Sequence, residues 1–592
     1  MLTTEQRQRM TSVLGGSLSL TERRRRSSDA SVRDPDDLAE RVDRWAQSVA
    51  DGDSEAFEAI LGARGLGARD GSLSKSVPLR SVDELPWAAA FRDLLELGGG
   101  DAAATPLPEG VAPALESFVR AAAYRLDSVD GAQTRLLGVE VKSDLLGALA
   151  EALDRVAGPV LAAERSLSLN LQVGFEASVE APWDLDRWIE VFESYPALAR
   201  VIAIVVEDWW SASREWMRRL QADRDRLADF FFDGESAGLV ENVTALGDPH
   251  GAGRRVLVVT FVGGRKLVYK PRDLRSAEVF QRLLAEVNRW GATLDLPTRR
   301  VLTRDGYAWE EFVERRACNS RHEVSAFYER MGSSLRLLQL LGATDFHFEN
   351  VIARGAHPVL VDLETLLVPS PSDVVGSSLV RDPAEDSPLG SGLLSHRVEV
   401  SGQRAVEIGA ICAMRGDAAV RWNGEIVRPS DFTDEILAGY AAMDRALADR
   451  RAELREHPLL LELAEVPVRF VPRPTRIYVS LLKVSLEPRC LIDGVVRELE
   501  LERLWKARLA NPALPVELVQ AEVDALLRSD IPRFEACPRD RSLRTEHAEI
   551  DGVFETSAWS SFEDRVRRLG EAAVGDDLAI IRETLAGLAR GF

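Results

Sequence analysis

A change of periodicity near Leu239 constrains the fold of this chain more than any other feature of its sequence. From residue 38 to residue 233, apolar residues recur three and four positions apart, as in amphipathic helices with one buried face. The aromatic and apolar side chains that we expect in the core of this helical part are Trp209, Trp216, Leu220, Leu227 and Phe230. After Leu239, short apolar runs alternate with turns and helical stretches, so the chain is predicted to be α+β.

The mixed part begins with a predicted strand hairpin. Residues 255–261 and 267–270 are strand-like, and Gly263-Gly264 between them gives the backbone the freedom for a tight turn. A helix at 276–290, strands at 297–303 and 307–313, and a helix at 323–341 follow, leading into a polar loop and another strand. This order of elements predicts a kinase-like, more specifically lipid-kinase-like, two-lobed core.

The length of 592 residues is too great for one hydrophobic core, so several structural parts are expected. We predict a polar, partly disordered arm at 1–37, a helical N-terminal region at 38–235, a kinase-like N-lobe at 236–315 and a kinase-like C-lobe at 316–592. The C-lobe is expected to contain C-terminal helices and a mobile loop near 369–392, which is rich in Ser, Asp, Pro and Gly.

Charge and cysteine content exclude several classes of protein. The formal net charge of −21 disfavours non-specific binding to nucleic acid, because like charges repel at long range. The four cysteines stand far apart and form no CxxC, which argues against a disulfide framework or structural zinc. No signal peptide or membrane span is apparent, so a soluble, cytoplasmic protein is expected.

The residues that most clearly suggest chemistry lie in the segment 341–367, LGATDFHFENVIARGAHPVLVDLETLL. Asp345 and Asn350 are five positions apart in a loop after a helix, and Asp362 lies twelve positions further on, after an apolar strand. Protein kinases use this spacing to orient the attacking hydroxyl and to hold Mg²⁺ against the triphosphate. His347 and Glu364 are additional candidates nearby. The alternative is a helix-loop-strand corner in which Asp345 and Asn350 only shape the turn.

A lysine precedes this segment at the end of a predicted strand. Lys270 ends the run KLVYK and could carry a positive charge to nucleotide phosphates. Arg272 could help or could be exposed. The alternative for a lysine at a strand end is simple solvation.

A glycine-rich turn at 247–255, GDPHGAGRR, lies before the hairpin. Backbone amides in such a turn can approach phosphate oxygens, with Asp248 and His250 at its mouth. Taken alone the pattern is weak, since Gly with Asp-Pro also makes ordinary turns.

A basic segment at 468–482, VRFVPRPTRIYVSLL, is the last candidate. Arg469, Arg473 and Thr475 are separated by even numbers of residues, so in an extended strand they would share one face and could surround a phosphate. Pro472 and Pro474 restrict such a strand to an edge, and an exposed basic edge is the alternative.

Together, five segments resemble the dehydratase domain of class II, LanM-type lanthipeptide synthetases from about residue 38 onward. The segments that carry the resemblance are GDPHGAGR, LVYKPRDLR, the TDFHFEN loop with VLVDLETLL, VRFVPRPT, and SDIPRF at 529–534. The resemblance implies a lipid-kinase-like core that uses ATP and Mg²⁺ to phosphorylate Ser and Thr of a precursor peptide. The phosphate is then eliminated to leave dehydroalanine or dehydrobutyrine.

The resemblance also implies roles for particular residues. Lys270 would bind ATP phosphates, Asp345 would act in phosphoryl transfer, and Asn350 with Asp362 would hold Mg²⁺. Arg469 and Thr475 match the family's residues for elimination, although the base that removes the α-proton is not identified. Further active-site positions of the family are matched by Asp248, His250, His347 and Glu364.

Full-length relatives in that family continue into a zinc-dependent cyclase domain, whose Cys and Cys-His ligands this sequence lacks. We therefore expect no ring closure by this chain, and as partners we expect a leader-bearing precursor peptide and a separate cyclase. Two other functions remain open: a kinase-like transferase that stops at the phosphopeptide, and a non-catalytic pseudokinase that binds the precursor.

Overall fold

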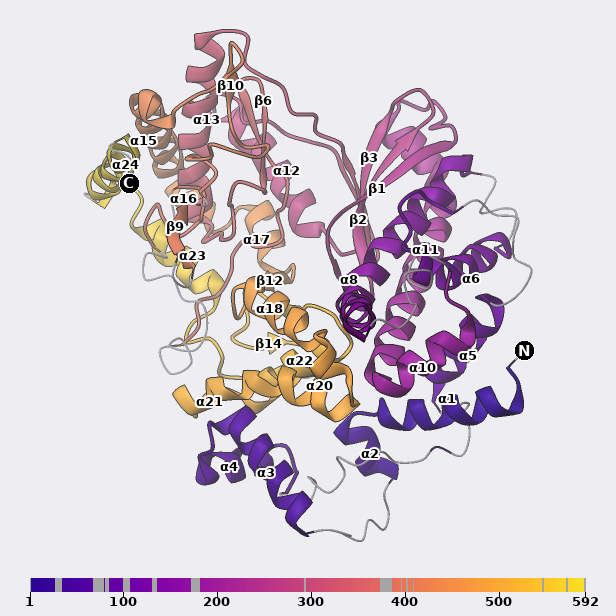
Figure 1. Cartoon of the computed structure of the whole chain (residues 1–592). Coiled ribbons are helices and arrows are strands. Elements are labelled where there is room, and N and C mark those ends of the chain that lie inside the picture. The colour runs from indigo at the N-terminus through magenta and orange to yellow at the C-terminus, as the bar shows by residue number, and fades with distance from the viewer. Residues whose placement is uncertain are drawn as a thin grey trace. The chain divides into compact units, whose positions relative to one another are not determined.

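Figure 1 shows a computed structural model of the whole chain. The chain forms two compact units, and each unit is made of two separate segments. Unit 1 combines Met1–Lys266 with Pro474–Pro532, and unit 2 combines Leu267–Arg473 with Arg533–Phe592. The structure describes residues 2–26, 35–67, 79, 85–98, 107–129, 136–171, 182–291, 294–372, 386–394, 397–400, 403–407, 409–545, 548–570 and 573–589.

Unit 1 is mainly helical. Its elements before residue 232 are α1 (Thr4–Gly16), α2 (Leu20–Arg26), α3 (Pro35–Ala50), α4 (Ser54–Ala63), α5 (Pro86–Gly98), η3 (Pro113–Leu115), α6 (Glu116–Asp127), α8 (Val139–Leu171), α10 (Leu185–Ser194) and α11 (Pro196–Phe231). Trp216, Leu220 and Leu227 of α11 are buried as predicted. Phe230 is 40% exposed, because its neighbour Phe231 takes the inward direction and successive helical residues point about 100° apart.

The N-terminal residues differ from the polar arm that the sequence suggested. Residues 4–16 form α1, which begins with a capping box between Thr3 and Gln6, and residues 20–26 form α2. Arg23, from the basic run, is fully buried and pairs with Asp493 at 2.8 Å. Apolar residues of α1 are buried as well, so this segment is part of the folded unit.

Unit 1 also contains the first strands and a later group of helices. β1 (Val240–His250) pairs antiparallel with β2 (Arg254–Phe261). The later elements are α18 (Thr475–Ser485), α19 (Pro488–Leu491), α20 (Gly494–Leu501), η5 (Glu502–Lys506), α21 (Ala507–Ala510) and α22 (Val516–Leu527).

Unit 2 begins within β3 (Lys266–Lys270), which pairs antiparallel with β5 (Tyr307–Glu311). β5 in turn pairs with β4 (Val301–Arg304), and α12 (Arg275–Arg289) lies between β3 and β4 in the sequence. These four elements lie where the sequence predicted them, within a few residues at each end. The strand expected at 297–303 begins later, at Val301, so residues 297–300 lie before β4.

Two helices form the centre of the unit 2 core. α13 (Arg321–Leu340) packs against α15 (Thr433–Asp449). The helices approach closely at two glycines: a Cβ on Gly332 would lie 2.0 Å from the Ile436 oxygen, and one on Gly439 would lie 1.9 Å from the Glu329 oxygen. The buried core therefore depends on glycine at both positions.

The candidate loop follows α13 and leads into a short hairpin. β6 (Val351–Arg354) pairs antiparallel with β7 (His357–Leu360). The remaining elements of unit 2 are β8 (Arg397–Val400), β9 (Gln403–Glu407), β10 (Arg421–Trp422), β11 (Glu425–Ile426), η4 (Pro429–Phe432), α16 (Arg451–Leu454), α17 (Pro458–Ala464), β12 (Val468–Phe470), β13 (Phe534–Ala536), β14 (Leu543–Arg544), β15 (Glu549–Ile550), α23 (Ala558–Arg567) and α24 (Ala573–Ala589).

The predicted strand across residues 468–482 is wrong after its first residues. β12 ends at Phe470, and α18 begins at Thr475. Pro472 and Pro474 explain the change, because proline cannot donate to a strand ladder and readily precedes a helix. Arg469, Arg473 and Thr475 therefore do not share one face of a single strand.

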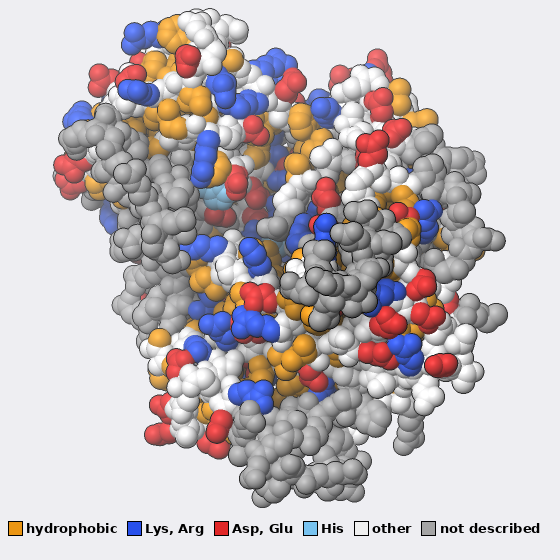
Figure 2. All heavy atoms as spheres, in the orientation of Figure 1, with side chains coloured by type: hydrophobic (Ala, Val, Ile, Leu, Met, Phe, Trp, Pro, Cys, Tyr) orange, Lys and Arg blue, Asp and Glu red, His pale blue; other side chains and the backbone are white. Residues whose placement is uncertain are grey.

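Part of the expected mobile loop at 369–392 lies outside the described residues, namely 373–385. Of the helices in the described part of the chain, none is long and apolar enough to cross a membrane. On the face shown in Figure 2, basic side chains are interspersed with acidic ones.

Candidate functional site

The loop after α13 holds Asp345 in an uncommon backbone conformation. Asp345 has φ +67°, a left-handed value that non-glycine residues seldom adopt. The Asn350 side-chain amide donates to the Asp345 carbonyl at 2.7 Å, and the Phe346 N–H donates to the Ser391 carbonyl at 2.9 Å. Such strain persists only where surrounding contacts determine it, and it is frequent at functional sites.

His347 lies beside the Asp345 carboxyl. Its Nδ1 accepts a hydrogen bond from the Glu349 N–H at 3.3 Å, and its Nε2 is 3.5 Å from Asp345 Oδ1. With Nδ1 accepting, a neutral imidazole carries its proton on Nε2, the nitrogen that faces the carboxyl. His347 is therefore positioned to orient Asp345 or to exchange a proton with it.

Lys270 reaches this region from β3, and its ammonium group is buried. Its Nζ donates to the Val361 carbonyl at 2.7 Å and lies 3.2 Å from Glu310 Oε2 and 3.7 Å from Asp362 Oδ1. The structure thus brings Lys270 and Asp362 together, although 92 residues separate them in the chain. Arg272, two residues after Lys270, is also involved, since it binds Asp362 Oδ1 at 3.0 Å.

Glu364 is almost fully buried and surrounded by guanidinium groups. It accepts from Arg469 at 2.6 Å and lies 3.2 Å from Arg272 and 3.9 Å from Arg533. The Arg469 backbone N–H also donates to the Glu364 carbonyl at 2.8 Å, which attaches β12 beside this segment. Burial alone would raise the pKa of Glu364, but the three arginines outweigh it and hold this pKa well below its usual value.

Asp345 shows the opposite electrostatic behaviour. Loss of surrounding water raises the pKa of its carboxyl; His347 and Arg469 act against this shift, and Asp362 and Glu364 add to it. The side chain itself remains 45% exposed. A carboxyl with a raised pKa beside an ionised one is the arrangement expected where one group exchanges protons and another binds cations.

The charged side chains of this cluster are Lys270, Arg272, Arg299, Arg469 and Arg533 with Glu310, Asp345, Asp362, Glu364 and Glu535, which is 3.3 Å from Arg533. Positive and negative groups therefore balance when all are ionised. Two buried carboxylate oxygens, Glu310 Oε1 and Glu364 Oε2, have no hydrogen-bond partner among the described residues. Such oxygens can accept a hydrogen bond or contact a cation, whereas the lysine and arginines of the cluster can contact phosphate oxygens.

A divalent cation would be held here only with help from its ligand. The described residues contain no group of three His, Cys, Asp or Glu side chains placed to hold a metal ion. Mg²⁺, however, is commonly bound by one or two protein oxygens together with phosphates and water. Asp362 and the amide oxygen of Asn350, whose NH₂ group is directed to Asp345, could supply such oxygens.

The glycine-rich turn of unit 1 is already bound by a carboxylate. Gly251, Ala252 and Gly253 all have positive φ, and the Ala252 N–H donates to Asp530 Oδ2 at 2.8 Å. A Cβ on Gly253 would lie 2.8 Å from the Asp208 Cβ, so the turn packs directly on α11. We expected the backbone amides of this turn to be available to a phosphate, but the Ala252 amide already donates to Asp530.

The remaining candidates also lie in unit 1. Asp248 and His250 lie in the last part of β1. The side chain of Asp248 is not among the side chains that the structure describes. Thr475 is the first residue of α18. None of these residues belongs to the unit that contains Lys270, Asp345, Asp362 and Glu364.

Sequence reasoning missed several members of the cluster. Glu310 and Arg299 form a buried ion pair at 2.6 Å, and Glu310 is also the acidic partner of Lys270. The available signal for Glu310 was a carboxylate that follows three apolar or aromatic residues in the strand YAWEE, whose first four residues are buried. Arg533 and Asp530 lie within the SDIPRF segment, but only the folded chain shows which groups they contact.

Residues 195–422 and 413–537 match the family described as Domain of unknown function (DUF4135). These segments cover more than half of the chain and include every clustered charged residue, and the chain belongs to this family. Among individual proteins it is similar to the lacticin 481/lactococcin biosynthesis protein LcnDR2 of Lactococcus lactis subsp. lactis, with 23% identity over 396 residues. The match covers 59% of this chain and 41% of that relative, so the chain spans about two fifths of the relative's length.

Proposed function

We propose that this protein is a lanthipeptide dehydratase, which uses ATP and Mg²⁺ to phosphorylate Ser and Thr of a precursor peptide and then eliminates the phosphate. Membership of the family and similarity to a lacticin 481/lactococcin biosynthesis protein support a role in lanthipeptide modification. The observation that carries the enzymatic part is the convergence of Lys270, Asp362 and Glu364 beside Asp345.

The proposal includes a kinase-like, two-lobed fold of the lipid-kinase type. Its support is the order of elements: a three-stranded antiparallel group β3-β5-β4 with α12, then α13, the Asp345 loop and the β6–β7 hairpin. Lys270 on β3 is paired with a buried acid, as the lysine of a kinase is, but the acid is Glu310 on β5.

In the phosphorylation step, the hydroxyl oxygen of the peptide forms a bond to the γ-phosphorus while the bond from that phosphorus to the bridging oxygen breaks, leaving ADP. Asp345 accepts the hydroxyl proton and orients the oxygen, and its raised pKa suits this exchange. Lys270 and Arg272 bind phosphate oxygens. Asn350 and Asp362 would hold Mg²⁺, which neutralises charge on the triphosphate.

In the elimination step, a base removes the α-proton, the Cα–Cβ double bond forms, and the Cβ–O bond breaks to release phosphate. Arg469 is the cation that we assign to the departing phosphate, because its guanidinium group lies beside Glu364 in the same cluster. Thr475 would supply a hydroxyl group to the phosphoester. We assign supporting roles in the active site to Asp248, His250, His347 and Glu364.

The proposed substrate is a precursor peptide with a leader, modified in the cytoplasm, where ATP is available. Closure of thioether rings is assigned to a separate cyclase.

Mass spectrometry tests the proposal directly. The protein is incubated with a candidate precursor peptide, ATP and Mg²⁺, and the expected product has lost one water for each modified Ser or Thr. Phosphopeptide as the final product would indicate a transferase instead. An unchanged peptide, with every candidate precursor tried, would contradict an enzymatic role.

A further inference from the structure

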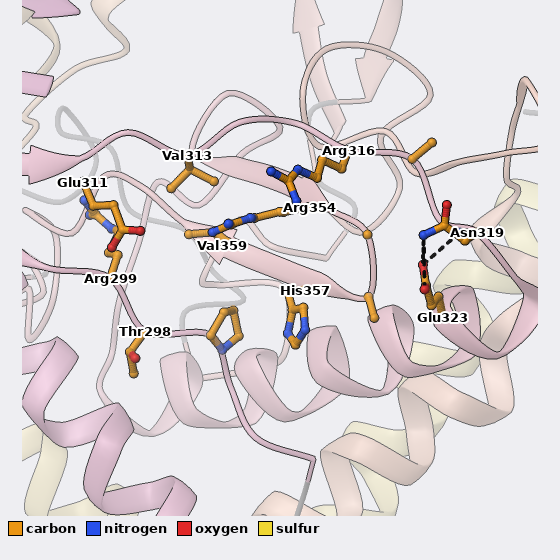
Figure 3. A pocket seen from close by; sticks show the side chains of 14 residues that line it. Thr298, Arg299, Glu311, Val313, Arg316, Asn319, Glu323, Arg354, His357 and Val359 are labelled. Atoms are coloured by element: carbon orange, nitrogen blue, oxygen red, sulfur yellow. Dashed lines mark hydrogen bonds between the residues drawn. The ribbon is translucent and has the colours of Figure 1, made fainter. Parts of the chain in front are cut away.

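Unit 2 contains a pocket whose lining residues include neither Lys270 nor Asp345. It has a volume of about 500 Å³, within the usual range for small-molecule sites. Its walls come from the segment before β4, the end of β5, the start of α13 and the β6–β7 hairpin (Figure 3).

Two arginines from separate segments meet at this pocket. Arg316 and Arg354 are neighbours in an isolated β-bridge, where the Arg316 N–H donates to the Ala353 carbonyl and the Gly355 N–H to the Arg316 carbonyl, each at 2.9 Å. Figure 3 shows both side chains at the pocket, with Arg354 extending toward Val359. Backbone hydrogen bonding therefore places the two arginines next to each other at the start of their side chains.

These two arginines form few ion pairs within the described part of the chain. Arg354 has no ion pair with any described residue, and Arg316 has only Glu314, 3.6 Å away at an exposed position. The two acids on the walls form no ion pair with either arginine: Glu311 lies 3.8 Å from Arg300 and accepts from its backbone N–H, and Glu323 accepts from Asn319 (Figure 3).

Arg299, a third arginine on the wall, is not available to a ligand. Its guanidinium group binds Glu310 and the carbonyls of Leu360 and Val361, so it presents mainly its hydrocarbon chain. His357 also lines the pocket; burial lowers its pKa, Arg330 and Arg354 add to this shift, and Glu323 acts against it.

Part of the pocket wall is apolar. Pro297, Val313, Ala356 and Val359 line it, and Val313 and Val359 are buried. A fitting ligand therefore needs an oxyanion for the arginines and a hydrocarbon or aromatic body for the apolar wall.

We propose that this pocket binds a small organic phosphate, with the phosphate group held by Arg316 and Arg354 and the organic part against Val313 and Val359. The inference does not depend on the proposed catalytic function, because it rests on a different set of side chains.

Isothermal titration calorimetry with phenyl phosphate tests this site on the full chain. We expect phenyl phosphate to bind about tenfold more tightly than inorganic phosphate, because its ring buries apolar surface. Arg316→Ala and Arg354→Ala should each weaken phenyl phosphate binding at least tenfold, whereas Arg300→Ala, a nearby arginine outside the pocket, should leave it unchanged.

A Lys270→Met variant separates this pocket from the proposed ATP site and should bind phenyl phosphate as the wild type does. Should an alanine variant fail to fold, Arg316→Gln and Arg354→Gln, which keep side-chain length without charge, replace it. Failure of the wild type to bind phenyl phosphate would overturn the proposal. So would binding that survives both arginine changes or is lost with Lys270→Met.

Discussion

Glu364 and Asp345 illustrate how neighbouring side chains give two carboxyls different properties. Glu364 has the guanidinium groups of Arg469, Arg272 and Arg533 around it and remains ionised, whereas Asp345 has a raised pKa. The low pKa keeps Glu364 available as a partner for cations, whereas the raised pKa makes the Asp345 carboxylate the stronger base of the two.

Asp345→Asn should strongly slow phosphorylation, and with it dehydration, because an amide cannot accept the hydroxyl proton. A fall of about 10²–10⁴-fold in the rate of phosphate transfer is expected for the loss of a general base. The rate is measured by quenched reactions and mass spectrometry. Glu349→Gln, a change at a 70% exposed position of the same loop, is the control and should retain activity.

The pH dependence of wild-type activity provides an independent check on Asp345. Since its pKa is raised, the fraction of ionised base should begin to fall at a pH above the ordinary range for aspartate. A rate that stays constant down to pH 4 would contradict its role as the base.

Arg469→Ala should let phosphopeptide accumulate, because phosphate transfer would continue while elimination slows. The change also removes one of three cationic partners from buried Glu364, so a loss of about 1–3 kcal/mol in unfolding free energy is expected. The double variant Arg469→Ala/Glu364→Gln distinguishes the two effects: it should recover stability but not elimination. Unphosphorylated peptide as the main species would count against this assignment.

At the scale of secondary-structure elements, close approaches depend on individual residues at the contacts. The glycine-rich turn between β1 and β2 is attached to Asp530 and packs on Asp208 of α11. Burial and the nearby Asp530 carboxylate raise the pKa of Asp208 to about 7. The helix pair α13 and α15 similarly depends on Gly332 and Gly439.

Asp530→Ala should free the turn between β1 and β2. Without its acceptor, the Ala252 N–H should exchange with deuterium at least about tenfold faster, as expected when a stabilising hydrogen bond is lost. Hydrogen exchange with mass spectrometry over peptides covering residues 247–255 measures this change. Glu517→Ala, at an exposed position of α22, should leave exchange there unchanged.

Gly439→Ala should destabilise unit 2 by several kcal/mol, because the added methyl group would meet the backbone oxygen of Glu329 at 1.9 Å and the helices would have to separate. Chemical denaturation measures the loss. Gly575→Ala in α24 is the matched control: nothing lies within 4 Å of its Cβ position, so stability should be unchanged or slightly higher. Equal effects from the two changes would show that backbone propensity, not helix contact, decides.

At the scale of the whole molecule, unit 1 is built from two segments far apart in the sequence, Met1–Lys266 and Pro474–Pro532, and hydrogen bonds connect them. The Leu20 N–H donates to Glu498 Oε2 at 2.5 Å, a contact between residues 478 positions apart. Nearby, Trp45 Nε1 donates to Glu502 at 2.8 Å. Burial, together with the charge of Glu502, raises the pKa of Glu498 to about 8.

This raised pKa predicts how the stability of unit 1 depends on pH. Between an ordinary glutamate pKa and about 8, the folded chain binds a proton at Glu498 that the unfolded chain has lost. The contribution of this residue therefore lowers stability as pH rises through that interval and becomes constant above it. Glu498→Gln should remove the contribution and raise stability at pH 8, whereas Glu500→Gln should not. Parallel stability curves for wild type and Glu498→Gln from pH 5 to pH 8 would disprove this account.

The sequence by itself determined the local elements and the kinds of residue available for chemistry. Hydrophobic periodicity and turn residues act over a few positions, so β2, β3, α12 and α13 could be predicted almost to their ends. The spacing of Asp345, Asn350 and Asp362 in a short loop and strand was likewise readable from the chain.

Only the tertiary structure decided which of these groups meet. Lys270 pairs with Glu310, and Glu364 is enclosed by Arg272, Arg469 and Arg533, through contacts between segments far apart in sequence. Local rules also failed at residues 475–485, where a helix replaces the expected strand. The physical reason is that burial and ion pairing depend on where the chain returns in space, and short-range periodicity carries no information about that path.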